Sequence, residues 1–261
     1  MKKKITTATL LAAKKQQKPM VWLTAYDAGA ARIAENAGVD VILVGDSVGM
    51  VNLGYDNTIP VTLDDMILHT AAVVRGCNTP WVVCDLPFGS YQQSPEQALQ
   101  NSVSILQKTG ADAIKLEGGK HMLETISFLS ARGLAVVGHI GLTPQSVHQF
   151  GNYKQRGQSS CERQTLLDDA VAIQQAGAVA LVLECIPAAL AATITEALDI
   201  PTVGIGAGKS CDAQVLVWHD LLGLSENIPP FAKAYTNLGE QAGAAIAQWA
   251  QDVREGKFPT S

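Results

Sequence analysis

The stretch from Val41 to Met50 reads VILVGDSVGM. An apolar run rich in β-branched residues leads into a glycine, a carboxylate and a hydroxyl, as expected for a strand that is buried on both faces and reactive at one end. The same pattern recurs four more times, as WVVCDLPFG (81–89), IKLEGG (114–119), VVGHIG (136–141) and LVLECIP (181–187). Each of these runs therefore delivers a polar group at its C-terminal end.

Glycines mark the starts of these strands. Helix-period segments end at a glycine one to four residues before an apolar run, at Gly38, Gly76, Gly110, Gly133 and Gly177, and glycine suits the left-handed end of a helix. The runs VWLTA (21–25), PTVGIG (201–206) and QVLVW (214–218) bring the candidate strands to eight. Eight strand-then-helix units predict an α/β fold of the (β/α)8 barrel type, with a doubly wound open sheet as the alternative.

Composition limits the class of protein. The chain has 261 residues, 47% hydrophobic and 16% charged, and a net charge of -5 without a basic stripe, which argues against nucleic acid as a partner. The apolar runs are strand-sized, so no membrane span is predicted. No linker divides the chain, so one domain over 1–261 is expected. Five cysteines without a CxxC pair indicate a reduced, cytoplasmic setting.

The sequence also predicts where several helices begin. The N-terminal MKKKITTATLLAAKK superficially resembles a short secretory signal, but its threonines dilute the apolar stretch, so an amphipathic helix capped by Thr6 or Thr7 is favoured. A capping pattern begins at Ser94, with Pro95 at the first helical position, and a weaker one begins at Thr62.

The strand ends carry the chemistry, because the C-terminal ends of barrel strands converge on one face. Asp46, Asp85 and Glu117 are oxygen donors that suit Mg²⁺, although each alone could simply cap the helix that follows it. Lys115 lies two residues before Glu117, on the same strand face, and can offer a cation to a substrate carboxylate.

Three further residues stand where acid–base chemistry is possible. Glu184 follows an apolar strand, a setting that favours a general base. His139 can donate a hydrogen bond to a developing charge, or can be a structural histidine. Cys185 has no evident base partner and is expected to pack.

Two longer segments invite interpretation. The run VGIGAGKS (203–210) ends like a phosphate-binding loop, but it has valine where that motif requires its first glycine, and it also fails GxGxxG. The polar segment from Val147 to Arg163 is too long for a minimal loop, so a mobile flap over the cavity is expected, with a disordered surface loop as the alternative.

Eight motifs in one order resemble a known family. They are LTAYD, LVGDSVGM, PVT, DLPFGSY, KLEGG, GHIGLTPQS, LVLECIP and GIGAG, from about Ile5 to about Pro259, and the family is ketopantoate hydroxymethyltransferase. The resemblance implies a barrel of the phosphoenolpyruvate/pyruvate type. It also implies transfer of a one-carbon unit from 5,10-methylenetetrahydrofolate to 3-methyl-2-oxobutanoate through a Mg²⁺-stabilised enolate, giving 2-dehydropantoate for pantothenate synthesis.

The resemblance also implies roles for residues. Asp46 and Asp85 would be metal ligands, with Glu117 completing the site directly or through water; Ser47, Asp46, Asp85, Lys115 and His139 would contact the keto acid, and Glu184 would accept the proton. A homodecamer is implied as well. One departure is that GYDNT (54–58) stands where the family commonly has GHDST, so Tyr55 and Asn57 replace histidine and serine.

Three alternatives from other classes stay open at this point. A carbon–carbon lyase on the same barrel would keep the carboxylates and Lys115 but cleave a different 2-oxo acid. A nucleotide binder would use GAGKS to hold phosphate. A non-catalytic barrel is disfavoured, because reactive groups stand at five strand ends.

Overall fold

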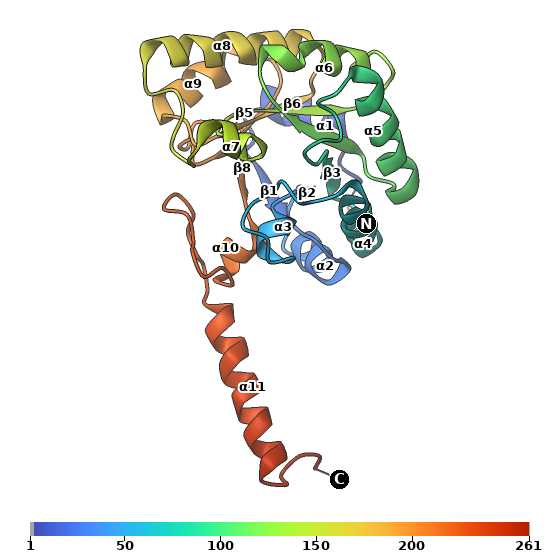
Figure 1. Cartoon of the computed structure of the whole chain (residues 1–261), viewed down its shortest axis with the longest axis vertical. Helices are drawn as coiled ribbons and strands as arrows, with labels where there is room; N and C mark the ends of the chain where they lie inside the picture. The colour runs from blue at the N-terminus through green and yellow to red at the C-terminus, as the bar shows by residue number, and fades with distance from the viewer. Residues whose placement is uncertain (1–2, 261) are drawn as a thin grey trace. The chain divides into compact units, whose positions relative to one another are not determined.

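Eight parallel strands form a closed barrel in sequence order (Figure 1). The computed structural model describes residues 3–260. The strands are β1 Met20–Thr24, β2 Val41–Val44, β3 Trp81–Asp85, β4 Ala113–Glu117, β5 Val136–Gly141, β6 Ala180–Glu184, β7 Thr202–Ile205 and β8 Ala213–Leu216. All eight predicted strands are confirmed, and closure rules out the open sheet.

Helices connect most of these strands. They are α1 Thr7–Lys15, α2 Ala28–Asn36, α3 Val48–Val51, α4 Leu63–Gly76, α5 Pro95–Thr109, η1 Lys120–Met122, α6 Leu123–Ser130, η2 Pro144–Ser146, α7 Val147–Phe150, α8 Ser160–Gln175, α9 Ala188–Ala197, α10 Trp218–Leu222 and α11 Leu238–Arg254. Within the described chain, residues 206–212 join β7 to β8 without a helix, so one of the eight expected strand-then-helix units lacks its helix. A phosphate-binding loop at GAGKS would need that helix.

The predicted helix caps are present. Thr6 caps α1 and forms a reciprocal pair with Thr9, and Thr62 does the same with Asp65 at α4. Ser94 accepts a hydrogen bond from the backbone N–H of Gln97 at the start of α5. These caps satisfy backbone donors that a helix start leaves without partners.

The inside of the barrel is apolar and well packed. Trp22 and Trp81 meet edge to face with ring centroids 6.2 Å apart, within a core cluster that continues through Val83 and Val182. The strands β2, β3 and β4 are buried at every residue, as the near-continuous apolar runs predict.

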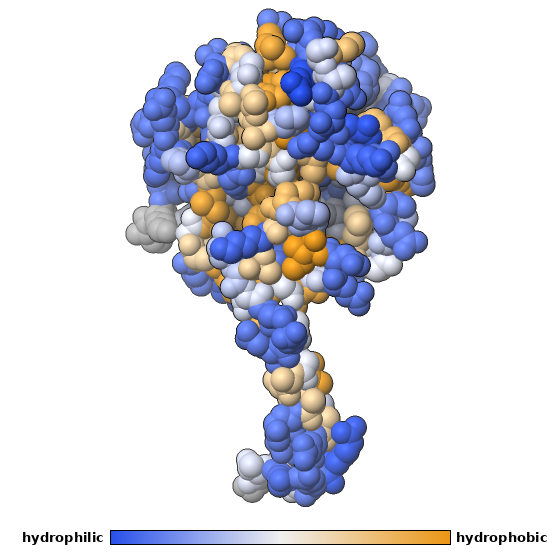
Figure 2. Space-filling view, turned by 90° about the vertical axis from the view of Figure 1, so that its left-hand side faces the viewer, coloured by the Kyte–Doolittle hydropathy of each residue, from blue (hydrophilic) through white to orange (hydrophobic). Residues whose placement is uncertain are grey.

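The chain forms two compact units, which meet in sequence at Val215 and Leu216. In the second unit, no residue of α11 is buried, and Ile246 and Trp249 are exposed on it; Figure 2 shows apolar patches among the polar surface of this helix. In the part of the chain that the structure describes, no helix is both long and apolar enough to cross a membrane. The expectation of a single domain over 1–261 stays a prediction.

Candidate active site

The strand register gathers the predicted site residues at one end of the barrel. Asp85 is paired with Lys115, Glu117 with His139, and Gly141 with Glu184. These pairings step round the barrel from β3 to β6, so the polar groups face one another at the strand ends.

The two aspartates are in direct contact. The backbone N–H of Asp46 donates to Oδ2 of Asp85 at 3.1 Å, and both side chains are buried. Gly45 leaves room for the Ser47 hydroxyl beside this contact, because a Cβ there would lie 2.8 Å from Oγ of Ser47. Burial, together with the charges of Asp85 and Glu117, raises the pKa of Asp46 to about 8. A nearby cation would relieve this crowding of buried negative charge.

Lys115 supplies one such cation. Its Nζ lies 3.2 Å from Oδ1 of Asp85 inside the barrel, where both side chains are about 95% buried. Burial works to lower the pKa of Lys115, but the charges of Asp85 and Glu117 outweigh it and raise that pKa above its usual value. The lysine is therefore charged, unlike a solvated lysine at a strand end.

His139 lies between two carboxylates. Its Nδ1 is 3.4 Å from Oε1 of Glu117, and its Nε2 is 3.2 Å from Oε2 of Glu184. Burial works to lower the pKa of His139, as does Lys115, whose Nζ lies 3.2 Å from Nδ1; the two carboxylates outweigh both and raise the pKa to about 9. Glu184 is 15% exposed and is the more accessible of the two carboxylates, which suits a group that meets substrate.

Ser47 is fixed by a tyrosine from the first strand's end. Tyr26 and Ser47 share a hydrogen bond between their hydroxyls at 2.9 Å, and Tyr26 is buried. The Ser47 hydroxyl thus has a defined position beside Asp46.

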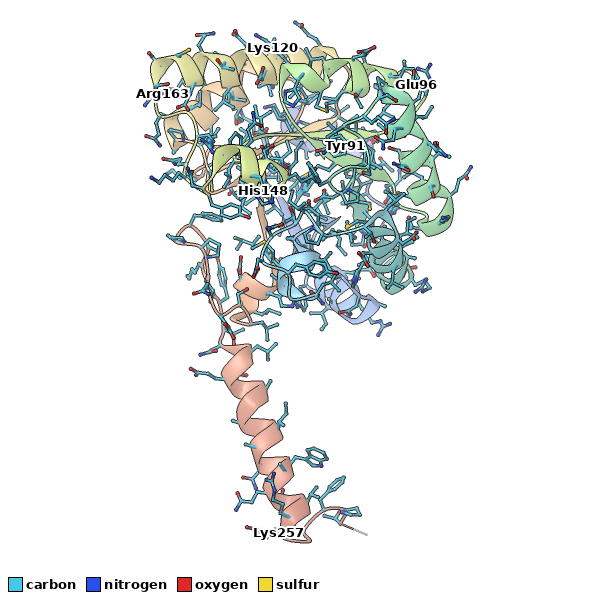
Figure 3. The ribbon with its side chains drawn as sticks, in the orientation of Figure 1. Tyr91, Glu96, Lys120, His148, Arg163 and Lys257 are labelled. Atoms are coloured by element: carbon cyan, nitrogen blue, oxygen red, sulfur yellow. The ribbon has the colours of Figure 1, made fainter. Side chains whose placement is uncertain are left out.

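Gln145 and Tyr91 were missed from the sequence. Gln145 is buried, and its Nε2 donates to Oδ2 of Asp46 and to the carbonyl of Leu86, each at 2.9 Å. The Tyr91 hydroxyl donates to Oε1 of Gln145 at 2.7 Å and accepts from the backbone N–H of Glu117 at 3.1 Å. Figure 3 labels Tyr91 on the connection between β3 and α5, and it labels Lys120 on η1 and Arg163 on α8. Tyr91 stands in the motif DLPFGSY and Gln145 in GLTPQS, so their place in these motifs could have marked them as candidate site residues.

The predicted flap is partly helical. Residues 147–163 contain the one-turn helix α7 and the first residues of α8, and movement of this segment over the cavity stays a prediction. The connecting loop is tied to the site, because the backbone N–H of Arg156 donates to the carbonyl of Cys185 at 2.9 Å and the Arg156 guanidinium stacks on Phe150. Burial and the charges of Asp46 and Glu184 raise the pKa of Tyr153 on the same loop.

Cys185 follows the base candidate in a left-handed conformation, with φ of 47°. It is buried, and burial together with the charge of Glu184 raises the pKa of its thiol to about 12. A thiol with that pKa stays protonated, in keeping with packing rather than nucleophilic chemistry.

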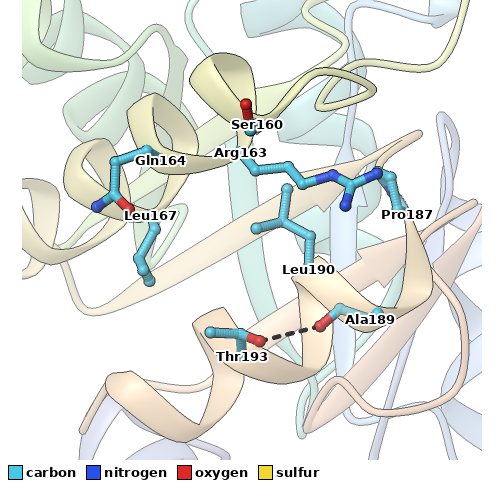
Figure 4. Close-up of a pocket in the computed structure, with 8 residues that line it drawn as sticks. All are labelled: Ser160, Arg163, Gln164, Leu167, Pro187, Ala189, Leu190 and Thr193. Atoms are coloured by element: carbon cyan, nitrogen blue, oxygen red, sulfur yellow. Dashed lines mark hydrogen bonds between the residues drawn. The ribbon is translucent and has the colours of Figure 1, made fainter.

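A separate groove lies between α8 and α9 (Figure 4). It is lined by Arg163, Leu167, Pro187 and Leu190, among others, and it contains none of the strand-end carboxylates. Its lining offers no acid–base pair, so the strand ends remain the candidate active site.

The donor set fits a divalent cation of the magnesium type. Within residues 3–260, no three His, Cys, Asp or Glu side chains are grouped so that they could hold a metal ion. Asp46 and Asp85 are, however, buried carboxylates that lie close enough for the charge of Asp85 to add to burial in raising the pKa of Asp46. Magnesium is commonly held by one or two carboxylates, with water and substrate oxygens in its other positions.

Comparisons with known proteins agree with the barrel and the strand-end motifs. A putative phosphonomutase from Burkholderia cenocepacia has a TM-score of 0.67 at 16% identity, covering 94% of this chain and 99% of that one. A 2,3-dimethylmalate lyase of the PEP mutase/isocitrate lyase superfamily has a TM-score of 0.59 at 17% identity, covering 97% and 89%. At these identities the likeness shows the fold alone, and it agrees with the expected (β/α)8 barrel.

Sequence similarity is much closer to one family. The family described as ketopantoate hydroxymethyltransferase matches residues 4–261. A 3-methyl-2-oxobutanoate hydroxymethyltransferase from Acaryochloris marina is 54% identical over 256 residues, 98% of this chain and 99% of that protein. Fold and matches together define a (β/α)8-barrel transferase. The chain belongs to the ketopantoate hydroxymethyltransferase family.

Proposed function

We propose that this enzyme transfers a one-carbon unit from 5,10-methylenetetrahydrofolate to 3-methyl-2-oxobutanoate and so forms 2-dehydropantoate for pantothenate synthesis. The observation that carries the proposal is the contact of His139 with Glu184, at the strand ends that also carry the buried Asp46 and Asp85. A carboxylate that can accept a proton and oxygen donors that suit a divalent cation support a reaction through an enolate.

Asp46 and Asp85 would hold Mg²⁺ directly, and Glu117 would reach it through water or directly. When bound, the ion would act as a Lewis acid toward the oxygens of the keto acid. The burial of Asp46 beside Asp85 supports this assignment, because a bound cation would offset the burial and the negative charge that raise the pKa of Asp46.

Ser47 and Lys115 would bind and orient the keto acid. The Ser47 hydroxyl is held by Tyr26, and the charged Lys115 can contact a substrate carboxylate from beside Asp85. A fixed hydroxyl and a buried ammonium favour one orientation of a small anion.

Glu184 would remove the proton from C3 of the keto acid. Breaking that C–H bond leaves an enolate, whose C3 forms the new bond to the folate-borne methylene carbon. Both C–N bonds of that methylene carbon break: water supplies the product hydroxyl, and tetrahydrofolate leaves with one proton from water and the proton that Glu184 removed. His139 would hold Glu184 in position, because its Nε2 lies 3.2 Å from the Glu184 carboxylate.

The direct test supplies the purified enzyme with Mg²⁺, 3-methyl-2-oxobutanoate and 5,10-methylenetetrahydrofolate. Formation of 2-dehydropantoate in step with tetrahydrofolate is expected. The lyase alternative is tested in the same experiment by offering branched 2-hydroxy and 2-oxo diacids in the absence of folate. Cleavage of those compounds without 2-dehydropantoate formation would replace the proposed reaction with a lyase reaction.

Location in the cytoplasm and assembly into a homodecamer are part of the same proposal. Light scattering of the purified chain tests the assembly. The loop that carries Tyr55 and Asn57 can be tested in the same way. If this loop touches folate or a neighbouring subunit, Tyr55→His and Asn57→Ser together should change the folate KM or the oligomer mass.

A further inference from the structure

Gln145 uses its whole hydrogen-bonding capacity within the site. Its two amide protons go to Oδ2 of Asp46 and the carbonyl of Leu86, and its oxygen accepts from the Tyr91 hydroxyl and from Nε2 of Gln92 at 3.1 Å. A primary amide offers two donors and accepts at two lone pairs, so all four positions are filled.

This pattern determines which way the amide points. Rotating the amide by half a turn would place its oxygen against Oδ2 of Asp46 and the Leu86 carbonyl, facing acceptors with an acceptor. The two hydrogen bonds to these buried acceptors would then be lost, and buried polar groups without partners are costly. The donor face of Gln145 is therefore directed at Asp46.

The same residue also reaches a second carboxylate. The backbone N–H of Gln145, in the short helix η2 after β5, donates to Oε2 of Glu117 at 3.1 Å. Tyr91 links the two residues further, because its hydroxyl contacts both the Glu117 backbone and the Gln145 amide. Two carboxylates from different strands are thus tied to one residue.

We propose that Gln145 is a positioning residue that sets the orientations of the Asp46 and Glu117 carboxylates toward the divalent cation. This inference rests on the proposed function, since it assigns a role at the same metal site. Gln145 acts through those two carboxylates, and groups that hold metal ligands in place commonly change metal affinity by about 10- to 100-fold when removed.

The test compares three variants with the parent enzyme. Gln145→Met keeps a side chain of similar length but cannot donate to Asp46. Tyr91→Phe keeps the ring and the Gln145 amide but removes one of the two donors to its oxygen. Gln93→Met makes the same chemical change at an exposed glutamine whose side-chain amide bonds only Gln97 among the contacts of the described chain. It is the matched control.

The probe is Mn²⁺, with the free ion counted by electron paramagnetic resonance, in the presence and absence of 3-methyl-2-oxobutanoate and without folate. Mn²⁺ affinity should fall about 10- to 100-fold in Gln145→Met, about three- to tenfold in Tyr91→Phe, and by less than about twofold in Gln93→Met. Thermal unfolding of each variant shows whether the fold survives. A merely structural role would lower the melting temperature and leave Mn²⁺ affinity unchanged in the folded fraction.

Parent-like Mn²⁺ affinity in folded Gln145→Met would overturn the inference while leaving the proposed reaction intact. If Gln145→Met does not fold, Tyr91→Phe decides: parent-like affinity in that variant overturns the inference, and a three- to tenfold loss supports it. Absence of Mn²⁺ binding in the parent enzyme, with the keto acid present, would overturn the proposed metal site and this inference together.

Discussion

The Nε2 atom of His139 lies 3.2 Å from Oε2 of Glu184. The opposite ring nitrogen faces Glu117, so one buried imidazole is shared by two carboxylates from neighbouring strands. Each carboxylate favours the protonated ring, and together they overcome burial and the charge of Lys115. Fold stability should therefore depend on the protonation of His139.

The first prediction concerns that dependence. The pKa of His139 is raised from 6.5 to about 9 in the folded chain, so its stabilising contribution is complete below about pH 6.5 and is lost as pH rises through 9. We expect the difference in unfolding free energy between the parent and His139→Gln, in metal-free buffer, to shrink by up to about 3 kcal/mol over that range. Urea titrations at pH 6, 7.5 and 9.5 measure it, and a difference that does not change with pH would contradict the assignment.

A second prediction uses two glycines with positive φ. A Cβ at Gly141 would lie 2.2 Å from the carbonyl oxygen of Glu184, whereas a Cβ at Gly133 would meet nothing within 4 Å. Gly133→Ala carries only the cost of the left-handed backbone, about 1–2 kcal/mol. Gly141→Ala must also displace the Glu184 backbone, so we expect a loss of more than about 3 kcal/mol in unfolding free energy and a loss of activity. Equal losses in the two variants would show that backbone conformation alone decides the cost.

The strands were predictable because parallel strands covered on both faces read as apolar runs, and because glycines end the preceding helices. The missing helix between β7 and β8 was not, since GIGAGKS looks like a strand-to-helix turn in sequence. Six of the proposed site residues, Asp46, Asp85, Lys115, Glu117, His139 and Glu184, stand at strand ends, where the barrel fixes their direction.

Gln145 and Tyr91 could not be predicted in this way, because they do not stand at strand ends. Each is in a connection that follows a strand, and their contacts join segments 26 to 99 residues apart in sequence. Periodicity says nothing about which of several glutamines or tyrosines in such connections turns inward. Only the packed structure shows that Gln145 is buried while Gln92 and Gln93 are exposed.

A third prediction concerns removal of the metal. Activity should be lost in excess EDTA and restored by Mg²⁺, because the proposed keto acid site shares Asp46 and Asp85 with the ion. The measurement is the rate of 2-dehydropantoate formation before chelation, after it, and after Mg²⁺ is added back. Full turnover at a metal content verified as nil would remove the metal from the proposal.

A fourth prediction tests Asp85 as a proposed metal-binding residue. Asp85→Asn should weaken Mg²⁺ and 3-methyl-2-oxobutanoate binding together, each by about 10- to 100-fold, because the amide carries no charge toward the ion or Lys115. Asp168→Asn, at an exposed aspartate paired with Lys120, is the control and should bind both ligands as the parent does. Calorimetric titration of each ligand provides the comparison. Loss of keto acid binding with unchanged Mg²⁺ affinity would assign Asp85 to the substrate alone.

The last prediction isolates Glu184. In D₂O with Mg²⁺ and without folate, the enzyme should exchange the C3 proton of 3-methyl-2-oxobutanoate for deuterium, since proton removal precedes the meeting with the folate carbon. Glu184→Gln keeps the size of the side chain but cannot accept that proton, so exchange should fall by about 10²- to 10⁴-fold. Keto acid binding should stay within several-fold, because the proposed binding residues Ser47 and Lys115 and the proposed metal ligands are unchanged. Exchange at the parent rate would move the base elsewhere, with His139 as the next candidate, and joint loss of binding and exchange would mean that Glu184 instead supports the site through His139.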